Sequence, residues 1–212
     1  KQARALRNIL VVSEISLALL LLMGAGLFVR SLNRLSAVSL GFSDDHILVA
    51  DLQVPPPSAA PADAHRNMDF YDNTLRELHS LPGVRSVAAA STLPVSGQGA
   101  VIHFNIQGRP PRNGSEYIMA NYRTISAEYF QTLRIPLLQG RWIESTDREN
   151  TPPIVVINEA MVKTYFPNEN PIGKKMQIGA TPDNSVPWMI IVGVVGNVMQ
   201  SLVADMPTEF YV

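Results

Sequence analysis

Few residues of this 212-residue chain stand at a spacing that could do chemistry. Gly173 and Lys174 resemble the end of a phosphate-binding loop, but the first glycine of such a loop is missing and no Ser or Thr follows the lysine. Gly24 and Gly26 begin a dinucleotide fingerprint, yet they stand within an apolar run and the third glycine is absent. The sequence therefore predicts no nucleotide site.

Other kinds of site are excluded on similar grounds. The chain has no cysteine, so it has neither a disulfide scaffold nor thiolate chemistry. A net charge of −1 gives no broad electrostatic footprint for nucleic acid. The four histidines do not stand at metal-ligand spacing: His46, His65, His79 and His103. We predict no catalytic, cofactor-binding or metal-binding residue, and no enzyme activity.

Glu14 is the one chemically unusual residue, because it is the only charge in an apolar run from Ile9 to Val29. At 1.5 Å per residue such a run forms a helix of ~32 Å, enough to cross a hydrocarbon core of about 30 Å. A signal peptide has a shorter apolar stretch and a small-residue cleavage site, whereas bulky and basic residues follow this run. The run predicts a transmembrane helix that contacts membrane lipid.

Two readings of Glu14 stay open. A carboxylate in a spanning helix normally marks a functional or partner-facing site. Glu14 also stands near the start of the run, where its side chain could reach the membrane interface, and we favour this second reading. Gly24 and Gly26 are small residues suited to contact with another helix.

The basic residues around the run favour a cytoplasmic N-terminus. Lys1, Arg4 and Arg7 precede it, and Arg30 and Arg34 follow it. Three against two is a weak positive-inside bias.

The helix is expected to continue out of the bilayer as a stalk over residues 30–38. Leu32, Leu35 and Val38 recur every three residues and form one apolar stripe, which a free linker would not need. No glycine or proline interrupts the segment before Gly41. We therefore divide the chain into a helix and stalk (residues 1–39) and a globular part (residues 40–212).

The globular part predicts a mixture of short helices and strands. Its first third reads as a strand, a helix and a strand with short joints, which predicts a crossover unit with parallel strands. The middle has antiparallel character, and the last third returns to strand, helix and strand, with Asn158 as helix cap. The expected strands are 47–54, 84–90, 101–107, 117–124, 154–157, 174–178 and 188–195; the expected helices are 63–81, 126–133 and 159–166.

These elements predict an α+β fold preceded by one transmembrane α-helix. We expect one α/β lobe from residues of about 44–95 and 150–212, because both segments show a strand–helix–strand pattern. A smaller antiparallel lobe, at about residues 98–145, is expected as an insertion between them.

Several segments resemble a MacB/FtsX-type permease module. The block RNILVVSEISLALLLLMGAGLFVRSL is similar to its first membrane segment, and LHSLPGVRSVAAASTLPVSG to a helix end with the strand and loop that follow. NYRTISAEYFQTLRIPLLQGR resembles the family pattern S-x-x-Y-F followed by L-G-I-P-L-x-x-G-R, with Arg134 where glycine is usual. VVINEAMVKTYFPNENPIGKKMQIG and IVGVVGNV complete the series in the family's order, and the whole looks like the duplicated permeases of Acidobacteria.

The resemblance implies a MacB-like periplasmic core domain, with an α/β porter-type lobe and an inserted smaller lobe, on its first transmembrane helix. It implies a permease of an ABC transporter in the bacterial inner membrane, with its globular part in the periplasm. It also implies mechanotransmission from a separate ABC ATPase subunit, and a second permease copy as a homodimer or duplicated half. Efflux of a substrate would follow, and the chain would be a fragment of the module.

Two other functions compete with this expectation. One is a membrane-tethered sensor or regulatory ectodomain, in which binding outside the cell changes a partner inside. The other is a membrane-anchored enzyme, which the missing catalytic residues disfavour. Three further spans after Val212 would favour the permease, and one span followed by a kinase or cyclase module would favour the receptor.

Overall fold

A computed structural model describes residues 2–36, 39–52, 61–96, 99–109, 117–147, 151–200 and 207–212 of the chain. The chain divides into two compact units, residues 1–39 and residues 40–212. The mixed helix-and-sheet class with a preceding apolar helix, predicted from the sequence, is confirmed.

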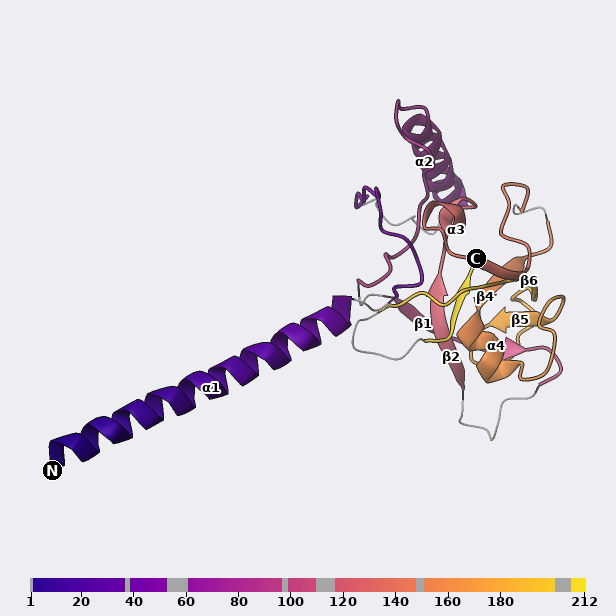
Figure 1. Cartoon of the computed structure of the whole chain (residues 1–212). Coiled ribbons are helices and arrows are strands. Elements are labelled where there is room, and N and C mark those ends of the chain that lie inside the picture. Colours follow the sequence, from indigo (N-terminus) through magenta and orange to yellow (C-terminus); the bar gives the residue numbers. More distant parts are fainter. Residues whose placement is uncertain are drawn as a thin grey trace. The chain divides into compact units, whose positions relative to one another are not determined.

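The first unit is a single helix, α1 (Gln2–Ser36). Figure 1 shows it as one continuous helix without a kink. Its interior lacks proline, and its leucines and alanines favour the helical backbone. The helix passes the end of the apolar run at Val29 and continues through Ser36.

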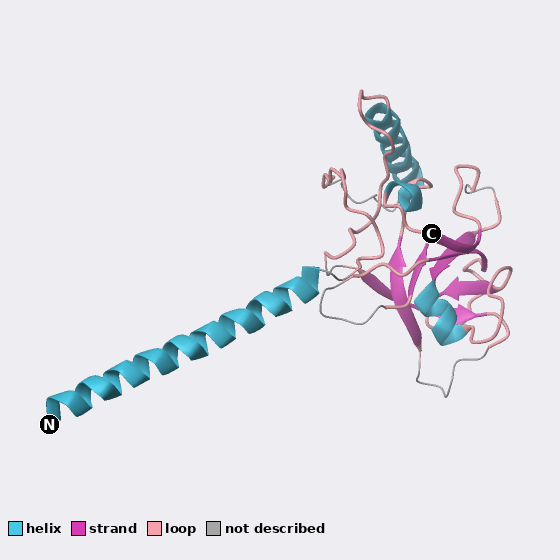
Figure 2. Cartoon of the chain, in the orientation of Figure 1, coloured by secondary structure: helices cyan, strands magenta, loops and turns pink. Residues whose placement is uncertain are grey.

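In the described part of the second unit, seven strands form one sheet (Figure 2). Two short helices lie between them along the chain: α3 (Tyr129–Thr132) follows β2, and α4 (Glu159–Tyr165) follows β4. The strands are β1 (Ala100–Ile106), β2 (Ile118–Arg123), β3 (Leu137–Gly140), β4 (Ile154–Asn158), β5 (Lys175–Ile178), β6 (Met189–Val195) and β7 (Glu209–Tyr211).

The strand order is β3-β6-β4-β7-β2-β1-β5, and a further pairing joins β5 to β6. That pairing closes β1, β2, β7, β4, β6 and β5 into a ring, with β3 paired to the far end of β6. β4 is followed by α4 and then by β5, so the strand–helix–strand pattern predicted for the last third is confirmed, and β4 pairs in parallel with β6, the strand after β5.

The sheet differs from the expected layout in how the thirds of the chain associate. β1 pairs with β5, and β2 pairs with β7, so the strands of the expected inserted lobe share one sheet with those of the last third. The strands of the last third therefore pair with one another and with the middle of the chain, and none of them pairs with residues 84–90. The lobe limits at about residues 98 and 145 do not coincide with an edge of this sheet.

Two predicted strands are wrong. Residues 47–52 form no ladder, and Leu48 is 96% exposed. Residues 84–90 make only one bridge, between Ala90 and Ile125. The apolar pattern of residues 84–90 does reflect burial, because Ala88 and Ala90 pack against a buried cluster. Burial of side chains, however, does not require backbone pairing in a ladder.

The helix between these segments is confirmed as α2 (Pro61–His79). Arg76 and His79 stand in its last turn, where positive charge favours the helix dipole. Its apolar stripe is not buried: Met68 and Leu78 are both exposed. The crossover unit predicted around this helix is therefore absent, since neither flanking segment forms a parallel ladder in the part of the chain described.

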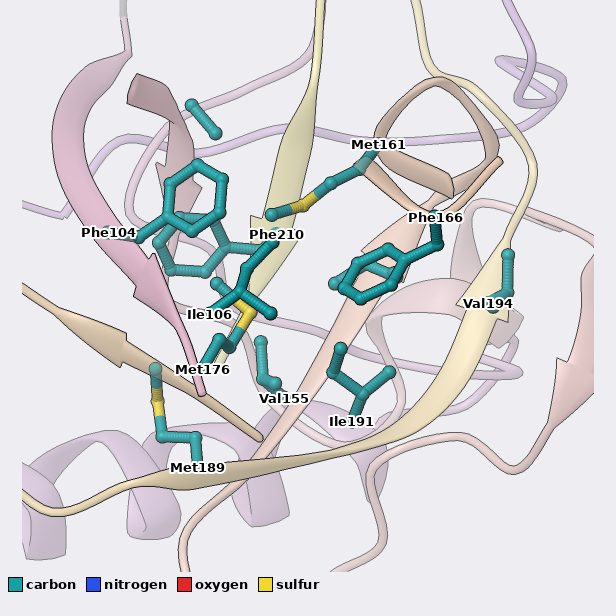
Figure 3. Close-up of a cluster of buried hydrophobic side chains, with 12 residues drawn as sticks. Phe104, Ile106, Val155, Met161, Phe166, Met176, Met189, Ile191, Val194 and Phe210 are labelled. Atoms are coloured by element: carbon teal, nitrogen blue, oxygen red, sulfur yellow. The ribbon is translucent and has the colours of Figure 1, made fainter. Parts of the chain in front are cut away.

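One buried cluster lies on one face of the curved sheet (Figure 3). Alternation along the strands selects its members, for example Val155 and Ile157 of β4, while Val156 points to the opposite face. Figure 3 shows side chains from the strands converging with Met161 and Phe166, so α4 and the residue after it cover this face.

A second cluster lies on the opposite face. Tyr129, Phe130 and Tyr211 form its aromatic centre, with the Phe130 and Tyr211 rings 5.0 Å apart in an edge arrangement. Phe42 and Ile47 pack against it from the segment that begins the globular unit. The start of the domain is thus fixed on the sheet by side-chain packing.

Asn158 ends β4 and begins α4. Its side-chain oxygen accepts from the Met161 backbone N–H at 2.9 Å, which confirms the predicted cap. The same oxygen accepts from the Glu209 backbone N–H at 3.0 Å, so it also fixes β7. The second predicted helix cap is wrong: Ser126 does not cap α3, and its hydroxyl accepts from the Ala89 backbone N–H instead.

Candidate functional site

The stretch Arg7–Asn33 of α1 is long and apolar enough to cross a membrane. The predicted transmembrane residues Ile9, Glu14 and Val29 all stand within it and are exposed. A Cβ atom at Gly24 or Gly26 would meet nothing within 4 Å, so both positions are free for contact with another helix. The functional roles of these residues stay predictions.

The stalk residues are placed only in part. Leu32 and Leu35 stand in α1 beyond the apolar run, and Leu32 is about half exposed. Val38 lies outside the described residues. The helix is unbroken through Ser36, and the role of residues 30–38 as a stalk stays a prediction.

The globular unit holds a buried polar cluster that the sequence did not predict. The guanidinium Nε of Arg123, on β2, donates to Oε1 of Glu209, on β7, at 3.1 Å. The two side chains are only 2% and 1% exposed. Because β2 and β7 are neighbouring parallel strands, this ion pair connects them from side chain to side chain.

Gln200 completes the pair into what we call the clasp: Arg123, Glu209 and Gln200. The Gln200 side-chain oxygen accepts from Arg123 Nη2 at 2.5 Å, and its amide donates to Glu209 Oε2 at 2.8 Å. Two groups outside the clasp accept from Arg123 Nη1, namely the Thr92 carbonyl at 2.8 Å and Tyr129 Oη at 3.1 Å. Every nitrogen of the Arg123 guanidinium therefore has an acceptor, as a buried cation requires.

Burial and charge act in opposite directions on the acid. Burial raises the pKa of Glu209, and this effect outweighs the Arg123 cation and the hydrogen bonds from Tyr211 and Gln200, which lower it. Burial likewise raises the pKa of Tyr129 to about 12, against the lowering effect of Arg123. The pKa of Tyr211 is raised well above its ordinary value, first by burial and then by the Glu209 charge.

The clasp suits a structural role better than a chemical one. Its charged groups are satisfied by each other and are closed off from solvent, so no substrate atom could reach them. The signal that could have identified it was an isolated charge in each of two short strands, in IMANYR and in EFY. Sequence alone does not reveal that two such strands are neighbours.

Residues considered in the sequence as incomplete nucleotide or metal motifs take part in ordinary structural contacts or belong to α2. Lys174, of the incomplete phosphate loop, pairs with Glu169, which also accepts from Arg109 at 2.7 Å. His65 and His79 belong to α2, and the His103 ring contacts the Tyr117 ring at a tilt of 60°, with ring centres 5.0 Å apart. Among the described residues, no three His, Cys, Asp or Glu side chains are grouped so that they could hold a metal ion.

The backbone conformation at Arg134 explains why the family pattern usually has glycine at this position. Its φ is +52°, in the left-handed region that glycine adopts without steric cost. It stands two residues after the end of α3, where the chain turns toward β3. Arg134 Nη1 donates to Ser43 Oγ at 3.2 Å, so the larger side chain also contacts the start of the domain.

Comparison with known proteins identifies the family to which this architecture corresponds. The sequence pattern of the MacB-like periplasmic core domain matches residues 9–211. A macrolide export ATP-binding/permease protein, MacB of Aggregatibacter actinomycetemcomitans, is 33% identical over 66 residues, which are 31% of this chain and 10% of that protein. The chain thus spans only a small part of this relative's length.

Two solved structures are similar to part of this chain. The periplasmic region of MacB from Actinobacillus actinomycetemcomitans is 23% identical with a TM-score of 0.46, over 66% of this chain and 53% of that one. The extracellular domain of the ABC-type transporter YknZ from Gram-positive bacteria is 16% identical with a TM-score of 0.44, over 66% and 60% of the two chains. This chain spans just over half of each of these domains.

Proposed function

The chain belongs to the MacB-like periplasmic core domain family of ABC-type transporter permeases, and from this premise we propose that it is the permease part of an exporter in the bacterial inner membrane. Its globular unit would lie outside the cytoplasm and help to export or extract a substrate at the outer face of that membrane. The observation that carries the proposal is the family match, which begins within the membrane-capable helix and extends through β7.

The energy for this work would come from a partner. The residues described include no recognisable nucleotide site, so we propose that a separate ABC ATPase subunit hydrolyses ATP on the cytoplasmic side. A second permease copy, as a homodimer or a duplicated half, would supply a matching helix. The exposed Gly24 and Gly26 of α1 offer a surface of the kind that such a helix contacts.

We propose that α1 transmits movement from the membrane to the globular unit. The helix continues seven residues beyond Val29, to Ser36, without a break. A continuous helix can carry a displacement along its axis, whereas a flexible linker absorbs it. The apolar Leu32 and Leu35 would pack against the corresponding stalk or against another span of the permease.

The test is a Gly-Gly-Ser insertion after Leu35 in the full-length permease. Export should be lost, while the partner's ATPase activity and the expression level are retained. As a control, the same insertion after Asn184, in an exposed turn of the globular unit, should leave export unchanged. Export at the normal rate with the insertion after Leu35 would show that the stalk is only a tether.

A further inference from the structure

A displacement that arrives along α1 must enter the globular unit through its first residues. We call residues 40–42 the junction segment. Met199 N–H donates to the Leu40 carbonyl at 2.9 Å, and Ser43 N–H, directly after the junction, donates to the Leu133 carbonyl at 2.9 Å. The junction is therefore held by backbone hydrogen bonds as well as by the packing of Phe42.

The main partner of the junction is a short stretch after β6, residues 197–200, which we call the anchor segment. It has no regular secondary structure of its own, so other parts of the domain must fix it. At its first residue, the Asn197 side chain accepts from the Ala160 N–H at 2.7 Å and donates to Glu159 at 3.1 Å. These bonds tie it to the first turn of α4. Val198 is fully buried in the second cluster.

The last residue of the anchor segment is Gln200, the polar member of the clasp. Its amide group is hydrogen-bonded on both sides, to Arg123 of β2 and to Glu209 of β7. The anchor segment is thus hydrogen-bonded to the junction through Met199 and to the ion pair between β2 and β7 through the next residue, Gln200. Solvent cannot replace Gln200 as the acceptor for Arg123, because the Arg123 side chain is only 2% exposed.

We infer that the clasp is the positioning device that holds the junction on the sheet: Arg123 and Glu209 fix Gln200, and Gln200 fixes the anchor segment against Leu40. A pull on the junction is then passed to β2 and β7, instead of peeling the junction from the domain. The mechanical meaning of this link rests on the proposed function, whereas the link itself is a property of the folded domain.

Hydrogen exchange at single amides tests the link in the 212-residue chain in detergent micelles. The Met199 amide reports on the junction because it donates to Leu40, and the Ile191 amide of β6 reports on the sheet because it donates to Lys174. Gln200→Leu keeps a side chain of similar size and removes both clasp contacts. We expect Met199 to exchange at least tenfold faster in this variant and Ile191 to change less than twofold.

Two further variants define the outcome. Glu209→Gln, which leaves Arg123 without its charge partner, should accelerate Met199 at least as much. Glu169→Gln is the matched control, because it makes the same chemical change in an exposed ion pair and should leave Met199 unchanged. Unchanged exchange at Met199 in Gln200→Leu would overturn the inference.

Equal acceleration of Met199 and Ile191 would also overturn it, since the clasp would then only stabilise the domain as a whole. The measurement needs neither an ATPase nor a transported substrate. A failure of the proposed export function would therefore leave this result standing, and the reverse also holds.

Discussion

A Cβ atom at Gly41 would lie 1.9 Å from the carbonyl oxygen of Asn197. The backbone of the junction segment therefore passes directly against the backbone of the anchor segment, with no room for a side chain. Gly41 also has a φ of +80°, which side chains disfavour. The close approach and the left-handed backbone are two separate reasons for glycine at this position.

Replacing Gly41 by Ala should release the junction from the anchor segment. The Met199 amide is expected to exchange at least tenfold faster, because its acceptor at Leu40 is displaced. Gly83→Ala is the matched control, since Gly83 has a similar φ of +89° but open space around the added Cβ. Equal effects of the two variants on Met199 would show that the contact with Asn197 is unimportant.

The left-handed backbone at Arg134 leads to a comparison between two variants. Arg134→Gly and Arg134→Ala both lose the hydrogen bond to Ser43, and they differ only in the Cβ atom. At a φ of +52° the alanine carries a steric cost that glycine lacks, so the glycine variant should be more stable by about 1 kcal/mol. Urea unfolding of both variants measures this difference. An alanine variant that is as stable as the glycine variant would contradict the observed backbone conformation.

The ion pair of the clasp should show strong coupling in a double-mutant cycle. Arg123→Met leaves a buried carboxylate unpaired, and Glu209→Leu leaves a buried guanidinium unpaired; each should lower the free energy of unfolding by about 3–5 kcal/mol. The double variant removes both charges and should be more stable than either single variant. Denaturant unfolding measures all four proteins. Single-variant losses that simply add in the double variant would show that the two side chains do not interact.

The sequence predicted what depends on local patterns. The apolar run gave α1, Asn158 gave the start of α4, the turn between β1 and β2 marked those two strands, and short apolar stretches gave β4 and β6 close to their observed limits. It could not give what depends on pairing between distant segments. The ion pair of the clasp joins residues 86 positions apart, and the sequence around Arg123 or Glu209 contains no pattern that indicates the other residue as its partner.

The two wrong strands have a related physical cause. Residues 47–52 and 84–90 are apolar enough for strands, but a strand also needs a neighbour with free backbone groups. Ala90 finds one such neighbour, Ile125, and the ladder does not extend from there. The left-handed Arg134 was beyond reach for a different reason, since arginine carries no local signal for that conformation.

High pH should destabilise the globular unit through Tyr129. In the unfolded chain this phenol ionises near its ordinary pKa of about 10, whereas in the folded chain the pKa is about 12. The folded state therefore holds its proton longer, and stability that is complete below pH 10 is lost as the pH rises toward 12. The loss from this group should be at most about 3 kcal/mol, since each pKa unit corresponds to about 1.4 kcal/mol.

Tyr129→Phe tests this prediction, because it keeps the ring and removes the ionisable hydroxyl. The urea midpoint of the variant should fall less steeply between pH 10 and pH 12 than that of the original chain. Tyr71→Phe, on the exposed surface of α2, serves as the control. If Tyr129→Phe and the original chain lose stability in parallel over this range, burial of the Tyr129 hydroxyl does not cause the alkaline unfolding.

Acid should weaken a different contact. Arg141 and Asp147 form a two-point ion pair, with Nη1–Oδ2 and Nη2–Oδ1 distances of 2.6 and 2.8 Å. Hydrogen bonds from Arg141 lower the pKa of Asp147, so its stabilisation is present above the ordinary carboxyl pKa of about 4 and is lost as the pH falls below it. Asp147→Asn should cost at most about 1 kcal/mol at pH 7, since the Arg141 side chain is 42% exposed, and almost nothing at pH 2. Thermal unfolding at the two pH values measures the difference; an equal cost at both would rule out the ion pair as its source.

The absence of cysteine allows the topology of the chain to be measured without background labelling. The length of the apolar stretch Arg7–Asn33 and the basic residues before it predict that the N-terminus faces the cytoplasm and the globular unit faces outward. Asn184→Cys, in an exposed turn, should react with a membrane-impermeant maleimide in intact spheroplasts. Gln2→Cys should react only after lysis. Labelling of Gln2→Cys in intact spheroplasts would show the opposite orientation. Mass spectrometry of the mature protein gives a second check: if the N-terminal residues are missing, the helix is a cleaved signal and cannot be the anchor through which movement reaches the domain.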